Sequence, residues 1–594
     1  MNIPDLYLDE DSDITTNGDQ EKADILNKKF VSEFTKEDNE PDIEIPDKTD
    51  KKLPDLKIDH NEVLKKLNKL KISKSPGPDS VHPRTLKEIA AIICKPMAMI
   101  FQRSLDSGKL PHDWKLSNIT AIYKKGSKKV AGNYRPVSLT SIACKVLESL
   151  IRDHVINFMK SNKLFTNKQF GFLGGRSTVL QLLILLDQLT EILDGGGAID
   201  IIYFDFAKAF DRVPHHRLML KLASYGISGN VYDWIKSFLS GRMQRVVVNG
   251  CFSEWLGVTR WVPQGSVKGP LLFVIFINDL PDVVGDESIM YLFADDAKLG
   301  HEIACLDDTL YVQNDVNSMK AWGKKWLMEY HPQKCKVLQL GKNPLKGQYA
   351  YKLDGHELEF VSSEKDLGVT FDDQLSFDQH MSQKISKANQ ILGVIRRTFQ
   401  HLDRESFLML YKSLVRPQIE YANQVWAPKL KRQINSIENV QRRATRMIPG
   451  LKDLPYEERL RTLKLPSLSY RRLRGDLIEM FKIVKPVEAG GYDKDVCEGF
   501  LKLKPRDTRG HTFMLSRKHT RLMLRERAFP HKCRDAWNSL SQHVVDANNV
   551  KTFESRLDKF LSNQKMIYDY EAEFCIADTG STSATDCDLM PEAS

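Results

Sequence analysis

The stretch that decides the fold is Met290-Tyr291-Leu292-Phe293-Ala294-Asp295-Asp296-Ala297-Lys298-Leu299. An apolar run stops at two adjacent acids, and apolar character resumes directly after them. This pattern is typical of a buried β-hairpin whose turn carries carboxylates. Taken alone, an Asp-Asp pair is more often a solvated turn than a catalytic site, so the neighbouring motifs decide between these two interpretations.

A second acidic break lies upstream, where the mainly apolar run Ile199-Asp200-Ile201-Ile202-Tyr203-Phe204 ends at Asp205 and the chain continues as Phe206-Ala207-Lys208-Ala209-Phe210-Asp211. A carboxylate at the end of a central strand is costly unless it is paired or bound to a cation, because apolar flanks deny it water. Mg²⁺ takes oxygen ligands, usually one or two carboxylates plus substrate phosphates. If Asp205 faces Asp295, the two could hold two Mg²⁺ ions about 3.5–4 Å apart, a spacing that suits phosphoryl transfer.

Bulk properties set the protein class. The chain has 594 residues, of which 41% are hydrophobic, enough for three or four globular domains. The formal charge of +9 conceals an acidic beginning and a basic later half. The longest apolar run, residues 271–277, is far shorter than the roughly 20 residues of a membrane span, so we expect no transmembrane helix. Nine scattered cysteines without zinc spacing predict reduced thiols, an intracellular location and no zinc knuckle.

Three motifs in order identify a family. The residues after Asp205, then Pro263-Gln264-Gly265-Ser266, then Phe293-Ala294-Asp295-Asp296 resemble motifs A, B and C of a non-LTR retrotransposon reverse transcriptase, of the jockey-like and related groups. The resemblance runs from about residue 21 to near residue 560. It implies an α+β right-hand polymerase with fingers, a palm with a ferredoxin-like antiparallel sheet and a helical thumb, followed by a mainly helical C-terminal region.

The resemblance and the composition together divide the chain into six segments. We expect an acidic linker with one helix in residues 1–55, fingers and the start of the palm in 56–190, the palm with motifs A to D in 191–345, the primer grip and thumb in 346–480, a basic C-terminal region in 481–570 and a disordered acidic tail in 571–594. Residues 22–34 have a helical period and resemble the linker that follows the family's endonuclease. We therefore expect the chain to begin after that domain.

The resemblance implies catalytic and metal-binding roles for Asp205, Asp295 and Asp296, which would hold two Mg²⁺ ions, with Mn²⁺ as a substitute. The main-chain carbonyl of Phe206 is a further implied ligand. Lys334 lies in a stretch that resembles motif D and matches the lysine that protonates the leaving pyrophosphate. A lysine beside a strand is more often a surface residue, and this alternative stays open.

Other motif residues are implied to bind the nucleotide. Lys124 and Arg135 lie on a predicted hairpin and would neutralise an incoming triphosphate, although a lysine pair such as Lys124-Lys125 is usually a solvated turn. Phe210, five residues after Asp205, corresponds to the steric gate. Its ring would clash with a ribose 2′-hydroxyl and so select deoxynucleotides. Standing alone, Phe210 would be interpreted as a core residue.

Two further motifs are implied to position the base pair and the primer. Gln264-Gly265 would let the backbone lie close under the nascent base pair, and Leu367-Gly368 resembles the primer-grip turn. The sequence departs from the family at Trp261, where relatives have glycine, and at Lys268, where leucine is usual. Either residue could crowd or charge the pocket, which is the reason to consider an inactive copy.

The loop Gln169-Phe170-Gly171-Phe172-Leu173-Gly174-Gly175-Arg176-Ser177-Thr178 resembles a template-contacting segment of the family. Two interpretations stand side by side. The glycines could let the backbone approach a phosphate, with Arg176 supplying positive charge. The same residues could equally be a loop before a helix capped by Ser or Thr.

These observations favour an RNA-directed DNA polymerase whose partners are an RNA template, a DNA primer and dNTPs. The alternative is a catalytically decayed or truncated copy that only binds RNA. A third hypothesis, an RNA-dependent RNA polymerase, conflicts with Phe210. We expect no membrane partner and a nuclear location, a cytoplasmic ribonucleoprotein location, or both, and the oligomeric state stays open.

Overall fold

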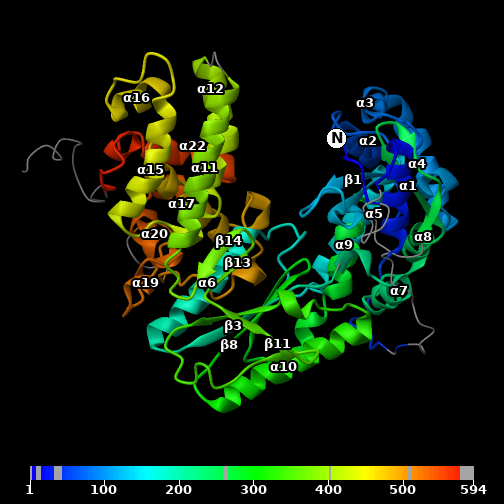
Figure 1. The fold of residues 1–594 in the computed structure, drawn as a ribbon, viewed down its shortest axis with the longest axis horizontal. Coiled ribbons are helices and arrows are strands. Elements are labelled where there is room, and N and C mark those ends of the chain that lie inside the picture. Colours follow the sequence, from blue (N-terminus) through cyan, green and yellow to red (C-terminus); the bar gives the residue numbers. More distant parts are fainter. Residues whose placement is uncertain are drawn as a thin grey trace, which may run out of the picture.

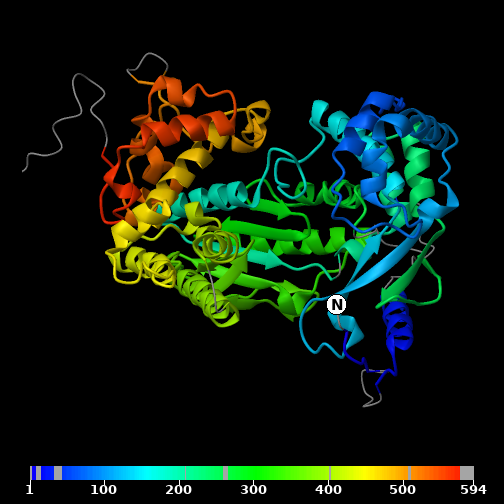
Figure 2. The same cartoon turned by 90° about the horizontal axis from the view of Figure 1, so that it is seen from above.

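The computed structural model describes residues 3–7, 15–32, 43, 45–207, 209–258, 265–399, 403–505 and 510–575. Figure 1 shows two groups of helices that rise on either side of a sheet, with the long helix α10 (Leu306–Trp326) across the base. Figure 2 shows from above that the sheet lies between the two groups. Within the described residues, no helix combines the length and apolarity needed to cross a bilayer.

The sheet at the base, here called the central sheet, has five strands in the order β12-β9-β3-β8-β7. The pairs β3–β8, β3–β9 and β7–β8 are antiparallel, and β12 joins β9 in parallel. Their bounds are β3 Ile199–Phe204, β7 Ile289–Phe293, β8 Asp296–Glu302, β9 Lys336–Leu340 and β12 Glu359–Val361.

Strand β3 separates two hydrophobic cores. Because side chains alternate along a strand, Ile202 and Phe204 belong to one core, and Ile199 and Ile201 belong to the other. The first core lies under the helices on one side of Figure 1 and the second under the helices on the other side. The central sheet therefore packs against both helical groups, one on each face.

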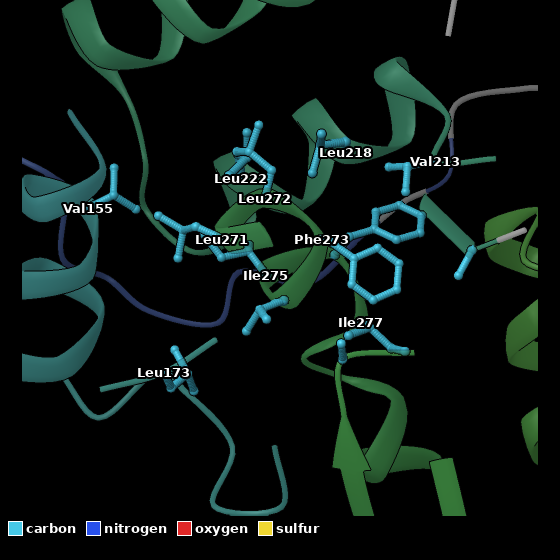
Figure 3. Close-up of a cluster of buried hydrophobic side chains, with 14 of the residues drawn as sticks. Val155, Leu173, Val213, Leu218, Leu222, Leu271, Leu272, Phe273, Ile275 and Ile277 are labelled. Carbon is cyan, nitrogen blue, oxygen red and sulfur yellow. The ribbon is translucent and has the colours of Figure 1, made fainter. Parts of the chain in front are cut away.

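The first helical group surrounds helix α9 (Gly269–Ile277), the apolar run noted in the sequence. A helix that is apolar on every face must be buried on every face. In Figure 3, its side chains point outward in several directions toward Val155 of α5 and Leu222 of α7. The other helices of this group are α2 His60–Asn68, α3 Pro83–Glu88, α4 Ala90–Asp106, α5 Ile142–Ser161, α7 His215–Ser224 and α8 Gly229–Leu239.

A second sheet, here called the side sheet, joins this group in the order β2-β1-β4-β5, with β6 on β4. The hairpin predicted to carry Lys124 and Arg135 is present as β1 (Leu116–Tyr123), paired antiparallel with β2 (Tyr134–Leu139). Helix α1 (Asp19–Ser32) packs on this sheet through Leu26 and Phe30. The other strands are β4 Arg242–Val248, β5 Cys251–Phe252 and β6 Leu256–Val258.

The second helical group follows two hairpins, β10–β11 (Lys352–Leu353, His356–Glu357) and β13–β14 (Ser363–Asp366, Val369–Asp372). Helix α6 (Thr178–Gly195) lies beneath this group and shares its core. The remaining helices are α11 Asp378–Thr398, α12 Arg404–Leu410, α13 Arg416–Glu420, α14 Asn423–Trp426, α15 Lys431–Thr445, α16 Tyr456–Leu463, α17 Leu468–Val484, α18 Lys494–Cys497, α19 Met523–Glu526, α20 Phe529–Asn538, α21 Gln542–Val545 and α22 Val550–Phe560. Most of the expected acidic tail, residues 576–594, lies outside the described residues.

Lys268 precedes helix α9, and its side chain is buried. The ammonium group lies 3.5 Å from the ring centre of Trp234 and 4.2 Å from that of Phe238, and it makes no hydrogen bond to any residue that the structure describes. Burial lowers its pKa from 10.5 to about 7. The departure from leucine thus places a cation in an aromatic pocket of the first core.

We expect Lys268→Met to raise the free energy of unfolding at pH 7 by roughly 1–4 kcal/mol, because an apolar side chain removes a buried charge without a hydrogen-bond partner. Above the folded pKa of about 7, the unfolded chain binds more protons at this lysine than the folded chain. Wild-type stability at this site therefore rises with pH, and the difference between variant and wild type should narrow toward about pH 10. Denaturant unfolding across this pH range measures the difference.

Lys221 is the matched control, because it is equally buried and burial also lowers its pKa to about 7. Its ammonium group, however, donates to Asp279 over 2.5 Å. Lys221→Met should destabilise the protein by about 3–5 kcal/mol, since it removes the cationic partner of the mostly buried Asp279 carboxylate and leaves it only the Trp322 indole N–H. A loss of stability in both variants would contradict the account of Lys268.

Candidate active site

The three acids predicted from the sequence lie at one end of the central sheet. Asp205 directly follows β3, and the β7–β8 hairpin closes through the two-residue turn Ala294-Asp295, with Phe293 paired to Asp296. Phe204 is the partner of Ala297 on β8, so Asp205 lies next to Asp296 on adjacent strands. Two antiparallel neighbours that end together thus bring the three carboxylates to one site.

Two of the three carboxylates, Asp295 and Asp296, have raised pKa values. Burial, followed by repulsion from Asp205, raises the pKa of Asp295. Asp296 is an exposed residue at the start of β8, although the surrounding protein desolvates its carboxylate. Burial and repulsion from Asp295 raise its pKa to about 6, with Asp366 and Asp205 adding further negative charge. A concentration of negative charge of this kind attracts a cation.

The donor set at this site consists of carboxylate oxygens, which are the ligands that Mg²⁺ and Mn²⁺ accept. In the described part of the chain, no three acidic, histidine or cysteine side chains are arranged as a ready metal cage. Instead, the Asp205 carboxylate accepts a hydrogen bond from Lys334 at 3.0 Å. The three carboxylates fit a divalent ion by their chemistry and charge. In this structure the Lys334 ammonium group compensates the charge of Asp205.

Basic side chains face the acids from two other elements. Lys334 follows α10 and contacts Asp205 directly. Lys124 follows β1, and Arg135 lies on the paired strand β2. Burial and repulsion from Arg135 lower the pKa of Lys124, while Asp205 opposes that shift, so these groups lie within electrostatic reach of one another. The structure therefore places the three predicted cations around the predicted acids.

The predicted gate Phe210 packs against helix α9. Its ring stacks on Phe273 with centroids 4.3 Å apart, and Phe172 meets it edge-on at 6.2 Å. Phe273 is buried, whereas Phe210 is only partly buried. One face of the Phe210 ring thus packs on the core, and part of the side chain remains accessible. This position is compatible with a steric gate and also with a packing residue.

The predicted motif B lies only partly within the described residues. Gln264 and the divergent Trp261 fall outside them. Gly265 has a φ of +113°, and a Cβ at this position would lie 2.6 Å from the carbonyl oxygen of Ser138. The glycine is therefore required where this segment packs on strand β2.

The predicted primer-grip turn Leu367-Gly368 closes the β13–β14 hairpin. Both residues have positive φ values, +45° and +89°, the requirement of a tight type I′ turn. The Tyr421 hydroxyl donates to the Leu367 carbonyl at 2.8 Å. This contact holds a non-glycine residue in a left-handed conformation.

A buried ion pair between Lys298 and Asp366 links this hairpin to the central sheet. Only 2% and 3% of these side chains is exposed. Lys298 lies two residues after Asp296 on β8, and Asp366 directly precedes the turn. The sequence analysis did not identify this pair, although a lysine within an apolar strand is a signal that a buried partner exists.

The structure corrects one interpretation of the loop before α6. Arg176, considered as a template contact, points inward with 5% of its side chain exposed and binds Asp493 at 3.1 Å. Ser177 caps α6 by accepting from the Leu180 amide, which is the second of the two interpretations. The sequence analysis also gave no role to Gln169, which is fully buried against the turn before Asp295.

Comparison with known proteins now identifies the chain. Residues 122–383 match the family described as reverse transcriptase (RNA-dependent DNA polymerase). A probable RNA-directed DNA polymerase from transposon BS of Drosophila melanogaster is 31% identical over 69% of this chain and 46% of that protein. The RNA-directed DNA polymerase from mobile element jockey of Drosophila funebris is 29% identical over 70% of this chain and 46% of that protein.

A more distant relative, a Pol polyprotein from the R1 retrotransposable element of Bradysia coprophila, is 24% identical over 64% of this chain and 38% of that protein. The chain thus spans less than half the length of these relatives. The match nevertheless covers β2, the three acids and the primer-grip turn. The chain therefore contains a reverse transcriptase domain of the non-LTR retrotransposon family.

Proposed function

We propose that the chain is an RNA-directed DNA polymerase that extends a DNA 3′-hydroxyl on an RNA template with dNTPs. The observation that carries this proposal is the position of Asp205, Asp295 and Asp296 at one sheet end, opposite Lys124, Arg135 and Lys334. Acids that can hold cations, facing cations that can hold phosphates, form a site for transferring a nucleotide from a triphosphate.

In this proposal, the central sheet is the palm. Its strands β9-β3-β8-β7 have helices between β3 and β7 and helix α10 between β8 and β9, which is the connectivity of a ferredoxin-like unit. The first helical group and the side sheet are the fingers. The β13–β14 hairpin is the primer grip, helices α11 to α17 are the thumb, and helices α18 to α22 form the C-terminal region.

The acids would hold two Mg²⁺ ions, which activate the attacking 3′-oxygen and stabilise the departing oxygen. Lys334 would leave Asp205 when the acids bind cations, and its ammonium group would then be free to protonate the pyrophosphate. Lys124 and Arg135 would neutralise the triphosphate and hold it in place. Gln264 and Gly265 would support the base pair, and Leu367 and Gly368 the primer end.

We expect Asp295→Asn to abolish DNA synthesis on an RNA template, because an amide oxygen lacks the charge that a divalent ion requires. The assay combines purified protein, RNA template, DNA primer, dNTPs and Mg²⁺. The control is Asp354→Asn, which alters an exposed carboxylate paired with Lys320 at 2.9 Å on the far hairpin. Synthesis that survives in Asp295→Asn would refute the proposal, and RNA binding by wild type without synthesis would favour a decayed copy.

We expect Phe210→Val to raise the incorporation of rNTPs relative to dNTPs by roughly 10-fold or more, because a smaller side chain removes the clash with the 2′-hydroxyl. The control Phe210→Tyr keeps the aromatic wall and should leave the ratio unchanged. Steady-state kinetics with matched dNTP and rNTP substrates give the ratio. An unchanged ratio in Phe210→Val, with DNA synthesis intact, would assign Phe210 to the core through its stack on Phe273.

A further inference from the structure

The catalytic hairpin lies at an edge of the central sheet, and a loop segment runs beside its outer strand. Strand β7 is the last strand of the sheet. The Leu292 amide donates to the carbonyl of Lys168 at 2.9 Å, and the Phe170 amide donates to the carbonyl of Leu292 at 2.8 Å. The residue between them, Gln169, therefore lies directly against the strand that leads to Asp295.

The side chain of Gln169 holds the turn itself. Its Oε1 atom accepts from the Ala294 amide at 2.8 Å and from the Gly171 amide at 2.7 Å, and its Nε2 atom donates to the Ala294 carbonyl at 3.4 Å. None of the Gln169 side chain is exposed. Both main-chain polar groups of the residue before Asp295 are thus fixed by one buried amide.

The turn needs such support because of its backbone conformation. Ala294 has a φ of +57°, a left-handed value that a residue with a Cβ adopts only when its surroundings impose it. Gly171 approaches so closely that a Cβ there would lie 2.4 Å from the Ala294 nitrogen. The loop is therefore shaped around the catalytic turn.

Arg176 fixes the loop that contains Gln169. Its Nη1 atom donates to the carbonyls of Thr166 and Gln169, each at 2.6 Å. Its Nε and Nη2 atoms bind one carboxylate oxygen of Asp493 at 3.3 and 3.1 Å. Asp493 lies beyond α17, in the segment before α18, so this contact joins parts of the chain 317 residues apart.

Two further contacts fix this junction. The Asp493 amide donates to the Gly175 carbonyl at 2.8 Å, and the Ser177 hydroxyl donates to the Tyr492 hydroxyl at 3.0 Å. Tyr492 is itself buried and donates to Glu479 of α17. The C-terminal region is therefore fastened to the loop by an ion pair, one main-chain hydrogen bond and one hydrogen bond between hydroxyls.

We propose that Asp493, Arg176 and Gln169 form a continuous support through which the C-terminal region positions the Asp295 hairpin. The three are positioning residues, because none of them belongs to the group of acids at the sheet end. The C-terminal region is then part of the construction of the catalytic site. This inference rests on the proposed polymerase function for its kinetic readout only.

The test compares Gln169→Leu and Asp493→Asn with a matched control. Asp558→Asn removes an ion pair of the same kind, between Arg474 of α17 and Asp558 of α22, at 2.6 Å. That pair touches neither the loop nor the hairpin. Asp493 is 24% exposed, and asparagine keeps its size and one oxygen that can accept from Arg176, so thermal unfolding of each variant checks that the fold is retained.

The first readout is amide hydrogen exchange in metal-free protein, measured on a peptide that covers residues 289–298. Exchange should be faster in Gln169→Leu and Asp493→Asn and unchanged in Asp558→Asn, because only the first two release the turn. The same acceleration should appear in an Asp295→Asn background, where synthesis is absent. This arm therefore stands even if the polymerase proposal fails.

The second readout is kinetic. Both support variants should need roughly 10- to 100-fold more Mg²⁺ for half-maximal synthesis, or lose as much in kcat, the range seen when the partners of metal ligands are removed. Their Kd for primer and template should stay at the wild-type value. In the double variant the effects should be less than additive, since both changes break one support.

Unchanged exchange at the hairpin in both variants would overturn the inference. The same follows if Asp558→Asn accelerates exchange equally, because the effect would then be general loosening. Weaker primer–template binding with unchanged Mg²⁺ requirement would instead assign Asp493 to nucleic-acid binding, which also contradicts the proposal.

Discussion

The structure depends on mutual repulsion among carboxylates that the fold forces together. Asp205, Asp295 and Asp296 end neighbouring strands, and Asp366 adds a fourth negative charge nearby. Negative charges that are close together and partly buried are unfavourable unless cations compensate them. Lys334 forms an ion pair with Asp205, and Lys298 forms one with Asp366. Asp295 and Asp296 have raised pKa values. The least compensated carboxylates are therefore those of the β7–β8 turn, where the proposed function places the metal ions.

The two hairpins that frame the site use the same device. Each closes with a two-residue turn in which a non-glycine residue has positive φ, Ala294 in one and Leu367 in the other. Each such residue is held by a distant polar side chain, Gln169 or Tyr421. Strained turns persist only where surroundings over-determine them. The conformation of both turns at the candidate site is therefore set by neighbours from other parts of the chain.

Local patterns in the sequence predicted the elements well. The apolar run broken at Asp295 and Asp296 predicted the β7–β8 hairpin, and a second hairpin was predicted around Lys124 and Arg135. The structure contains both, the second as β1–β2. Pairings between distant residues were not predicted. The inward course of Arg176 depends on Asp493, and the burial of Lys268 depends on Trp234 and Phe238. No local period reports such partners, because a side chain's environment is decided by segments that meet only in the folded chain.

Strand β3 carries a last consequence. Its alternate residues serve both cores, Ile202 and Phe204 on one side and Ile199 and Ile201 on the other. Unfolding of either helical half exposes one face of this strand, while the other half remains packed on the opposite face. The backbone that carries Asp205 is therefore packed on both faces. Unfolding of the outer helices in one half should leave the position of Asp205 unchanged until the packing on β3 itself is lost.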